Sequence, residues 1–303
     1  MISLPDKNLI KERNVHVRNR QTPTQILNIN SIDSPKIVIC IVPGNPGIAN
    51  LYVPFMKALY NAWSGKAEVI AFSHYCHNLP TQELVSLEQQ LNHTIDVIQD
   101  YVLTEYGVHV IFIGHSLGSW LLLNAQNHLD NMAASKNIKI LKFVSMTPFF
   151  EADFEHGRAR RLNICGTYHN LMGVLGGILG YIPKSILAML LKMLEGNHLG
   201  NHCISACTNL MSYYSIRQYF FLAGQYISHN IRFDMKILSN LSRQNRIVVM
   251  VCPNDTWMTN KIYNAISQNI EKVHFVKQFR HAFVTCERMS EYAGTLVFNA
   301  LKN

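Results

Sequence analysis

Residues 108–118, VHVIFIGHSLG, indicate the fold more strongly than any other part of the chain. Their first six residues form the β-branched and aromatic run of a buried strand, and the apolar stretch 119–125 that follows favours a helix. Between the two, GHSLG matches G-x-S-x-G, a turn that projects its serine at the edge of a sheet. The pattern predicts Ser116 as a nucleophile, with Gly114 and Gly118 closing the turn around it. An ordinary strand-to-helix turn that contains a serine is the alternative.

Short apolar runs alternate with longer amphipathic stretches elsewhere, as expected for a parallel sheet with crossover helices. Near-continuous apolar runs, typical of strands covered on both faces, occupy 36–42, 108–113, 140–145 and 246–252, and further strands are predicted at 67–72 and 273–276. Residues 82–103 place leucine, isoleucine and valine at helical spacing. With the serine turn, these elements predict an α/β-hydrolase fold, a mostly parallel central sheet flanked by helices.

The alternation breaks between about 151 and 237, where the chain is rich in Leu, Met, Tyr and Gly. We expect a helical cap or lid at 151–237, inserted into a single discontinuous core formed by 1–150 and 238–303. Within the cap, residues 171–194 hold two apolar stretches on either side of a Pro-Lys-Ser break. Neither stretch reaches the roughly 20 residues of a membrane-spanning helix. Residues 171–194 are therefore either a lid packed on the core or a peripheral contact with a lipid droplet or membrane.

Composition narrows the class of protein. The 303 residues are 48% hydrophobic and carry a formal net charge of +8, but the basic residues are scattered, so nucleic-acid binding is not expected. The seven cysteines are an odd number, and residues 1–20 lack the apolar run of a secretory signal. These features predict a cytoplasmic protein, either free or peripheral on lipid droplets or membranes.

Acyl transfer needs backbone donors for the oxyanion that forms in its transition state. The N–H of Leu117, the residue after the nucleophile, is one predicted donor. The loop PGNPG at 43–47 follows the strand 36–42, where this fold places the second donor. Pro46 has no N–H, so Asn45, made accessible by Gly44, is the predicted residue. A simple Gly/Pro turn is the alternative reading of this loop.

Chain order selects the remaining catalytic groups, because this fold places its serine, acid and histidine in that sequence. Among 14 histidines, His281 follows the last predicted strand and is the predicted base. His274 lies inside that strand, and His109 and His115 are interpreted as structural. The predicted acid, directly after the strand 246–252, is Asp255.

Other residues compete for the acid role or suggest a metal site. Asp153 is the runner-up acid and Asp234 a weaker choice, while Asp255 could also be a plain turn residue. One cluster contains side chains of the kinds that bind zinc, namely His198, His202, Cys203 and Cys207. On a helix, however, the two pairs would lie about 100° apart, which suits a tetrahedral ion poorly. No metal or organic cofactor is expected.

Several strings resemble the lipid droplet-associated hydrolase family, a branch of the α/β-hydrolases. They are PGNPG at 43–47, YVPF at 52–55, SLEQQ at 86–90, GHSLG at 114–118, LAGQ at 222–225, DTW at 255–257 and HAFV at 281–284. The resemblance covers about 36–284 and implies a triad of Ser116, Asp255 and His281 in an esterase linked to neutral-lipid storage. The chain departs from the family at MTPFF, 146–150, where Phe-Pro-Thr-Ile is usual, and in its cap.

These observations predict a serine hydrolase that cleaves carboxylic esters through an acyl-enzyme. The resemblance implies that the esters are those of lipids. Because a fold does not determine its function, a thioesterase, peptidase or acyltransferase is one alternative. A lipid-surface binding protein with weak or no catalysis is the other.

Overall fold

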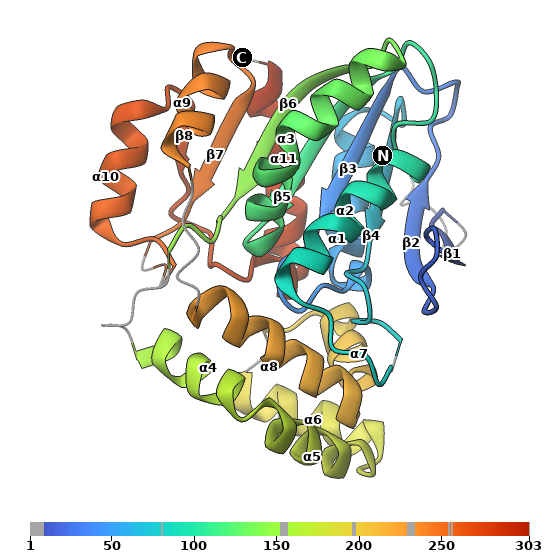
Figure 1. Ribbon diagram of the computed structural model, residues 1–303, viewed down its shortest axis with the longest axis vertical. Helices are drawn as coiled ribbons and strands as arrows, with labels where there is room; N and C mark the ends of the chain where they lie inside the picture. The colour runs from blue at the N-terminus through green and yellow to red at the C-terminus, as the bar shows by residue number, and fades with distance from the viewer. Residues whose placement is uncertain are drawn as a thin grey trace.

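The computed structural model describes residues 9–79, 81–151, 157–195, 198–228, 234–253, 255 and 257–302. Eight strands form one sheet in the order β1-β2-β4-β3-β5-β6-β7-β8 (Figure 1). The strands are β1 (Lys11–Val15), β2 (Thr24–Ile29), β3 (Ile37–Val42), β4 (Ala67–Phe72), β5 (His109–His115), β6 (Lys139–Met146), β7 (Ile247–Val251) and β8 (Val273–Phe275). Strand β2 is antiparallel to β1 and β4, and every other neighbouring pair is parallel. The predicted mostly parallel sheet is confirmed.

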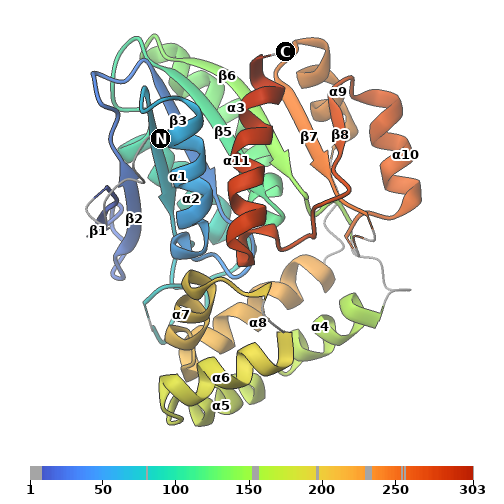
Figure 2. The same cartoon turned by 180° about the vertical axis from the view of Figure 1, so that it is seen from behind.

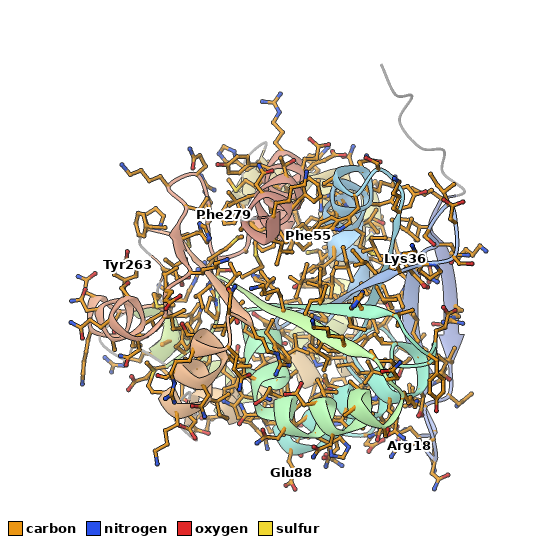
Figure 3. The ribbon with its side chains drawn as sticks, turned by 90° about the horizontal axis from the view of Figure 1, so that it is seen from above. Arg18, Lys36, Phe55, Glu88, Tyr263 and Phe279 are labelled. Atoms are coloured by element: carbon orange, nitrogen blue, oxygen red, sulfur yellow. The ribbon has the colours of Figure 1, made fainter. Side chains whose placement is uncertain are left out.

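Helices cover both faces of the sheet. One face carries α1 (Val53–Ala62) and α11 (Glu287–Lys302), and the other carries α2 (Leu87–Tyr101), α3 (Leu117–Ser135) and α9 (Met235–Arg243), while α10 (Asn260–Asn269) lies beyond β8 (Figures 1 and 2). Seen from above, Phe55 and Phe279 lie on the α1–α11 side, and Glu88 lies on the α2–α3 side (Figure 3). All residues of β7 and nearly all of β3 and β5 are buried, which explains their continuous apolar sequences.

Two features of the sequence prediction need correction. The helix predicted over 82–103 begins only at Leu87, because Ser86 and Gln89 form a capping box. The Gln89 N–H donates to Ser86 Oγ at 3.2 Å, and the Gln89 side chain accepts from the Ser86 N–H at 2.7 Å. The antiparallel strands β1 and β2 were not predicted. Four of the five residues of β1 are exposed, so this edge strand leaves no apolar pattern in the sequence, whereas β2 is largely buried and does carry apolar residues.

A second group of helices lies across the carboxyl ends of the parallel strands (Figures 1 and 2). It consists of α4 (Gly157–Thr167), α5 (His169–Gly180), α6 (Lys184–Glu195), α7 (Asn201–Asn209) and α8 (Tyr213–Ser228). Helix α9 instead packs on the sheet, where its Leu238 and Leu241 join the core. The cap boundaries at 151 and 237 stay a prediction, because residues 152–156 and 229–233 lie outside the described part of the chain.

Helix α8 is bound to the core through side-chain amides. The Val85 N–H donates to Gln218 Oε1 at 2.9 Å, and Gln218 Nε2 donates to the Val85 carbonyl at the same distance. Further along the helix, Gln225 Oε1 accepts from the Leu87 N–H at 2.7 Å. Gln218 is buried, so its two hydrogen bonds are shielded from water and both polar groups of Val85 are satisfied. The segment that precedes α2 is thereby attached to α8.

Helix α5 packs on α8 through glycines. A Cβ added at Gly173 would lie 2.9 Å from Arg217 Cβ, and one added at Gly176 would lie 2.5 Å from Ile216 Cβ. Because the glycines face α8, the large apolar residues of α5 are left on the outside, and α6 adds more. The exposed set is Leu171, Val174, Leu175, Ile178, Leu179, Ile186, Met189, Leu190, Met193 and Leu194. We call this set the apolar face of α5 and α6.

The helices of the cap are short compared with the thickness of a membrane. Among the described residues, no single helix is long and apolar enough to cross a membrane. Helices α5 and α6 satisfy the length and composition requirement only as a pair, and they bend by 117° at the break between them.

The glycine packing predicts different outcomes for two adjacent alanine substitutions in α5. By helix propensity alone, each Gly-to-Ala substitution should stabilise α5 by about 1 kcal/mol. A Cβ at Gly177 would have its nearest neighbour at 3.5 Å, an ordinary contact, whereas a Cβ at Gly176 would overlap Ile216 at 2.5 Å. Gly177→Ala should leave the thermal midpoint unchanged or raise it, and Gly176→Ala should lower it by about 2–8 °C through overpacking. Equal midpoints in a thermal unfolding experiment would contradict this packing.

Candidate active site

Ser116 lies on the turn between β5 and α3, at φ 51° and ψ −119°, a conformation that is strained for a residue with a Cβ. Glycines make this turn possible. A Cβ at Gly114 would lie 2.6 Å from the backbone of Ser119, and one at Gly118 would lie 2.2 Å from the carbonyl oxygen of Val42. Ser119 Oγ also donates to the Gly114 carbonyl at 2.7 Å, a contact that the sequence motif does not reveal. The predicted turn therefore exists, with Ser116 partly exposed.

The structure brings Ser116, His281 and Asp255 into one hydrogen-bonded chain. His281 Nε2 lies 2.8 Å from Ser116 Oγ, and His281 Nδ1 lies 2.9 Å from Asp255 Oδ2. An ionised carboxylate only accepts hydrogen bonds, so Nδ1 carries the proton and Nε2 is free to accept the Ser116 hydroxyl. An imidazole held between a hydroxyl and a carboxylate can activate that hydroxyl as a nucleophile.

Asp255 follows β7, and its side chain is fully buried. Burial by itself raises the pKa of this carboxyl, but the charge and hydrogen bond of His281 and the N–H of Trp257 bring the net pKa below its ordinary value. The Trp257 N–H donates to Asp255 Oδ1 at 3.0 Å. Both oxygens are thus engaged, which holds the carboxylate ionised and oriented toward His281.

The competing residues lie elsewhere. His274 pairs with Met250 in the register of β8 and β7, and His109 begins β5 at the end of the strand opposite Ser116. Asp234 is an N-cap whose side chain accepts from the Lys236 N–H at the start of α9. The runner-up acid, Asp153, lies outside the described residues.

The suggested metal cluster at the start of α7 does not assemble. His202 Nε2 forms a hydrogen bond with the Val284 carbonyl at 2.8 Å, and Cys203 and Cys207 bring their sulfurs to 3.8 Å of one another. Within the described ranges, no three histidine, cysteine or acidic side chains are grouped so that they could hold a metal ion.

The loop 43–47 lies against the serine. A Cβ at Gly44 would be 3.0 Å from Ser116 Cβ. Two of the loop's N–H groups are engaged, since Gly44 donates to Tyr52 Oη at 2.8 Å and Gly47 donates to His77 Nδ1 at 3.0 Å. In the part of the chain that the structure describes, the N–H groups of Asn45 and Leu117 have no hydrogen-bond partner. Both are therefore available to an incoming oxygen atom.

Aromatic side chains from separate elements meet beside His281. Phe149, which follows β6, lies 5.1 Å from Trp257 and 4.9 Å from Tyr226 of α8 between ring centroids. The Trp257 ring is in turn 6.3 Å from that of His281. The sequence motifs single out none of these rings as a group, because they come from three distant parts of the chain. They form a buried aromatic cluster that links the end of β6 and α8 to Trp257 beside the imidazole.

Known protein families and structures were compared with the chain. A family model described as lipid-droplet associated hydrolase matches residues 35–284. The chain belongs to this family. Its relatives include the lipid droplet-associated hydrolase of Dictyostelium discoideum, 25% identical over 93% of this chain and 95% of that protein. The Homo sapiens protein of the same name is 22% identical over 92% of this chain and 89% of that protein. The resemblance carried by the motifs is thus confirmed.

The chain is also similar in structure to solved proteins outside this family. A haloalkane dehalogenase loop variant from Bradyrhizobium elkanii matches with a TM-score of 0.62 at 12% identity, covering 97% of this chain and 96% of the other. A thioesterase domain from the curacin biosynthetic pathway gives 0.61 at 15% identity, covering 98% and 100%. An esterase from Thermogutta terrifontis gives 0.57 at 11% identity, covering 96% and 99%. These likenesses confirm the predicted α/β-hydrolase fold.

The lowered pKa of Asp255 predicts a pH dependence of stability. Because the folded pKa lies below the unfolded one, the ionised carboxylate contributes stability above about pH 4, and this contribution is lost as the pH falls through the folded value. Asp255→Asn removes the titrating group. The difference in unfolding free energy between wild type and this variant should therefore shrink below about pH 4. Urea unfolding at a series of pH values measures it, and a constant difference would contradict the shift.

Proposed function

We propose that the chain is a serine ester hydrolase in which Ser116 is the nucleophile, His281 the base and Asp255 the acid. The observation that carries the proposal is the continuous hydrogen-bond chain through these three side chains, with 2.8 Å between Ser116 Oγ and His281 Nε2. Its chain order, serine then acid then histidine, is the order usual for this fold. Membership of a family described as a hydrolase supports the same assignment.

The reaction proceeds in two acyl-transfer steps. As Ser116 Oγ attacks the ester carbonyl, its proton passes to His281 Nε2, and the resulting imidazolium is stabilised by the Asp255 carboxylate. The N–H groups of Asn45 and Leu117 donate to the oxyanion, aided by the N-terminus of α3 behind Leu117. His281 then protonates the leaving alkoxide, and a water activated by the same imidazole releases the acid. Every step uses the chain's own groups and water.

An apolar ester is the substrate class that best fits the surroundings of His281. The rings of Phe149, Trp257 and Tyr226 provide buried apolar surface beside the imidazole. An acyl chain that packs against these rings in the bound complex would be stabilised by about 0.8 kcal/mol for each methylene removed from water. The relatives carry the name lipid droplet-associated hydrolase, which agrees with a lipid ester.

Replacement of the nucleophile tests the reaction itself. Ser116→Ala should lower the kcat for p-nitrophenyl esters by about 10⁴–10⁶-fold, as expected when a triad serine is lost. It should also abolish covalent labelling by a fluorophosphonate. Hydrolysis by the wild type should rise from acetate toward longer acyl chains. Activity confined to acetate would keep the serine mechanism and reject the lipid ester, while full activity in Ser116→Ala would reject the mechanism.

We also propose that residues 151–237 act as a cap whose segment 171–194 contacts a lipid surface. The apolar face of α5 and α6 supports this, since Met193 and Leu194 are 74% and 82% exposed. A contiguous exposed apolar surface of this kind marks an interface. Because α5 turns its glycines toward α8, its large apolar side chains are left on the outer side of the helix. The cap lies over the carboxyl ends of the strands, the edge that carries Ser116, so the proposed contact brings the site close to lipid (Figure 2).

Flotation with phospholipid-coated triolein droplets tests the lipid contact. A triple variant, Leu171→Ser, Ile178→Ser and Met193→Ser, should reduce the droplet-bound fraction at least about tenfold, because each loses the burial of a large apolar side chain. Ile32 and Tyr106 supply the matched control, since they are 71% and 75% exposed and precede β3 and β5 at the opposite end of the sheet. Ile32→Ser with Tyr106→Ser should float like the wild type. Equal flotation of all three proteins would reject the contact.

A further inference from the structure

A second hydrogen-bonded chain runs behind the serine, through buried residues that the proposed reaction does not use. It begins at the carbonyl oxygen of His281, which lies 2.8 Å from His115 Nε2. His115 Nδ1 lies 2.6 Å from Tyr52 Oη, and Tyr52 Oη accepts from the Gly44 N–H at 2.8 Å. The chain therefore joins the backbone of the loop that holds His281 to the backbone of the loop 43–47.

The direction of every bond in this chain follows from its two ends. The His281 carbonyl can only accept, so His115 Nε2 must carry a hydrogen. A neutral imidazole then has its acceptor at Nδ1, which must receive the Tyr52 hydroxyl hydrogen. The Tyr52 oxygen is left to accept from the Gly44 N–H, which can only donate. With His115 and Tyr52 both neutral, a single arrangement of protons satisfies every group in the chain.

The surroundings keep both groups neutral. Burial lowers the pKa of His115 to about 3, with the neighbouring His281 acting in the same direction. Burial likewise raises the pKa of Tyr52 far above its ordinary value, although the Gly44 hydrogen bond partly offsets it. Within the pH range in which an esterase operates, neither His115 nor Tyr52 changes its charge. The donor and acceptor of each hydrogen bond in the chain therefore stay the same.

Packing fixes the same two side chains in place. Phe283 lies edge-on to the His115 ring, with 5.0 Å between centroids, and Tyr52 lies edge-on from another side at 5.8 Å. Thr147 Oγ1 also donates to the His281 carbonyl at 3.0 Å, so this carbonyl is held by donors from two elements. On the other end, a Cβ at Gly44 would lie 3.2 Å from His115 Nδ1, which leaves the loop little room to move.

We propose that Tyr52 and His115 are positioning residues that hold the oxyanion-donor loop, through Gly44, at a fixed distance from the backbone of His281. The inference rests on the proposed function. Asn45 is covalently attached to Gly44, so a shift of the Gly44 N–H displaces the predicted oxyanion donor. The two groups that must act together on the transition state, a proton acceptor and an oxyanion donor, are thereby coupled through the interior of the protein.

Removal of the Tyr52 hydroxyl tests the coupling. Tyr52→Phe keeps the ring but leaves the Gly44 N–H and His115 Nδ1 without their shared partner. With a p-nitrophenyl ester, kcat should fall about 10- to 100-fold, since a misplaced donor costs up to what a missing one does. KM should stay within about twofold, because ground-state binding is not altered. The rate of fluorophosphonate labelling should fall in parallel with kcat.

A double-mutant cycle separates positioning from general destabilisation. If Tyr52 and His115 act as one chain, His115→Phe added to Tyr52→Phe should cost little beyond either single change. Tyr75→Phe is the matched control, because Tyr75 is also buried and its hydroxyl also meets a backbone N–H, that of Thr22, away from the serine. It should leave kcat unchanged, and its effect should add to that of Tyr52→Phe. All assays are run below the thermal midpoint of each variant.

The outcomes distinguish this inference from the function on which it rests. If the wild type is active and Tyr52→Phe has the same kcat, the positioning role is overturned and the proposed function is kept. Fully additive losses in the Tyr52 and His115 cycle would also overturn it, since independent residues add. Wild-type protein that neither hydrolyses esters nor reacts with fluorophosphonate would overturn the proposed function and this inference together.

Discussion

Gly118 lies against the end of β3, where any side chain would meet the carbonyl oxygens of Val42 and Pro43. Because only hydrogen fits there, the first turn of α3 lies directly beside the loop 43–47. Ser116 has its strained conformation in the same turn, and the N–H groups of Asn45 and Leu117 lie at the same edge of the sheet as its hydroxyl. The remaining contacts of the site depend on this crowding, since they assume a fixed distance between β3 and the serine turn.

Near that contact, one side chain of the site is ionised and two neighbouring titratable side chains are neutral. Asp255 is the buried anion, and its oxygens receive hydrogen bonds from His281 and the Trp257 N–H. His115 and Tyr52, a few ångströms away, are kept neutral by burial. A low local dielectric strengthens the attraction between an imidazolium at His281 and Asp255, and makes a second charge nearby costly. The arrangement suits a reaction in which positive charge develops transiently on one histidine only.

Local patterns predicted what depends on local physics. The apolar runs of β3, β5, β6 and β7 and the glycines around Ser116 are visible in the sequence, and chain order was enough to select His281 and Asp255, which the structure brings into contact. The Tyr52–His115 bond was not predictable, because it joins residues 63 positions apart by a proximity that only the folded sheet creates. Strand β1 was not predicted because it is an exposed edge strand without an apolar pattern. The start of α2 was missed although the Ser86–Gln89 capping box stood in the sequence.

The amide of Gln218 has a consequence for how the cap can be altered. It satisfies the N–H and the carbonyl of Val85 as a neighbouring strand would, so the core segment before α2 is incomplete without α8. Helix α8 is therefore an integral part of the core, even though it follows β6 in an inserted region. The α5–α6 hairpin is different, since its α5 rests on α8 largely through glycines and its α6 packs on α7. Evolution could exchange this outer hairpin among relatives, and protein engineers could replace it, while the inner helix must be kept.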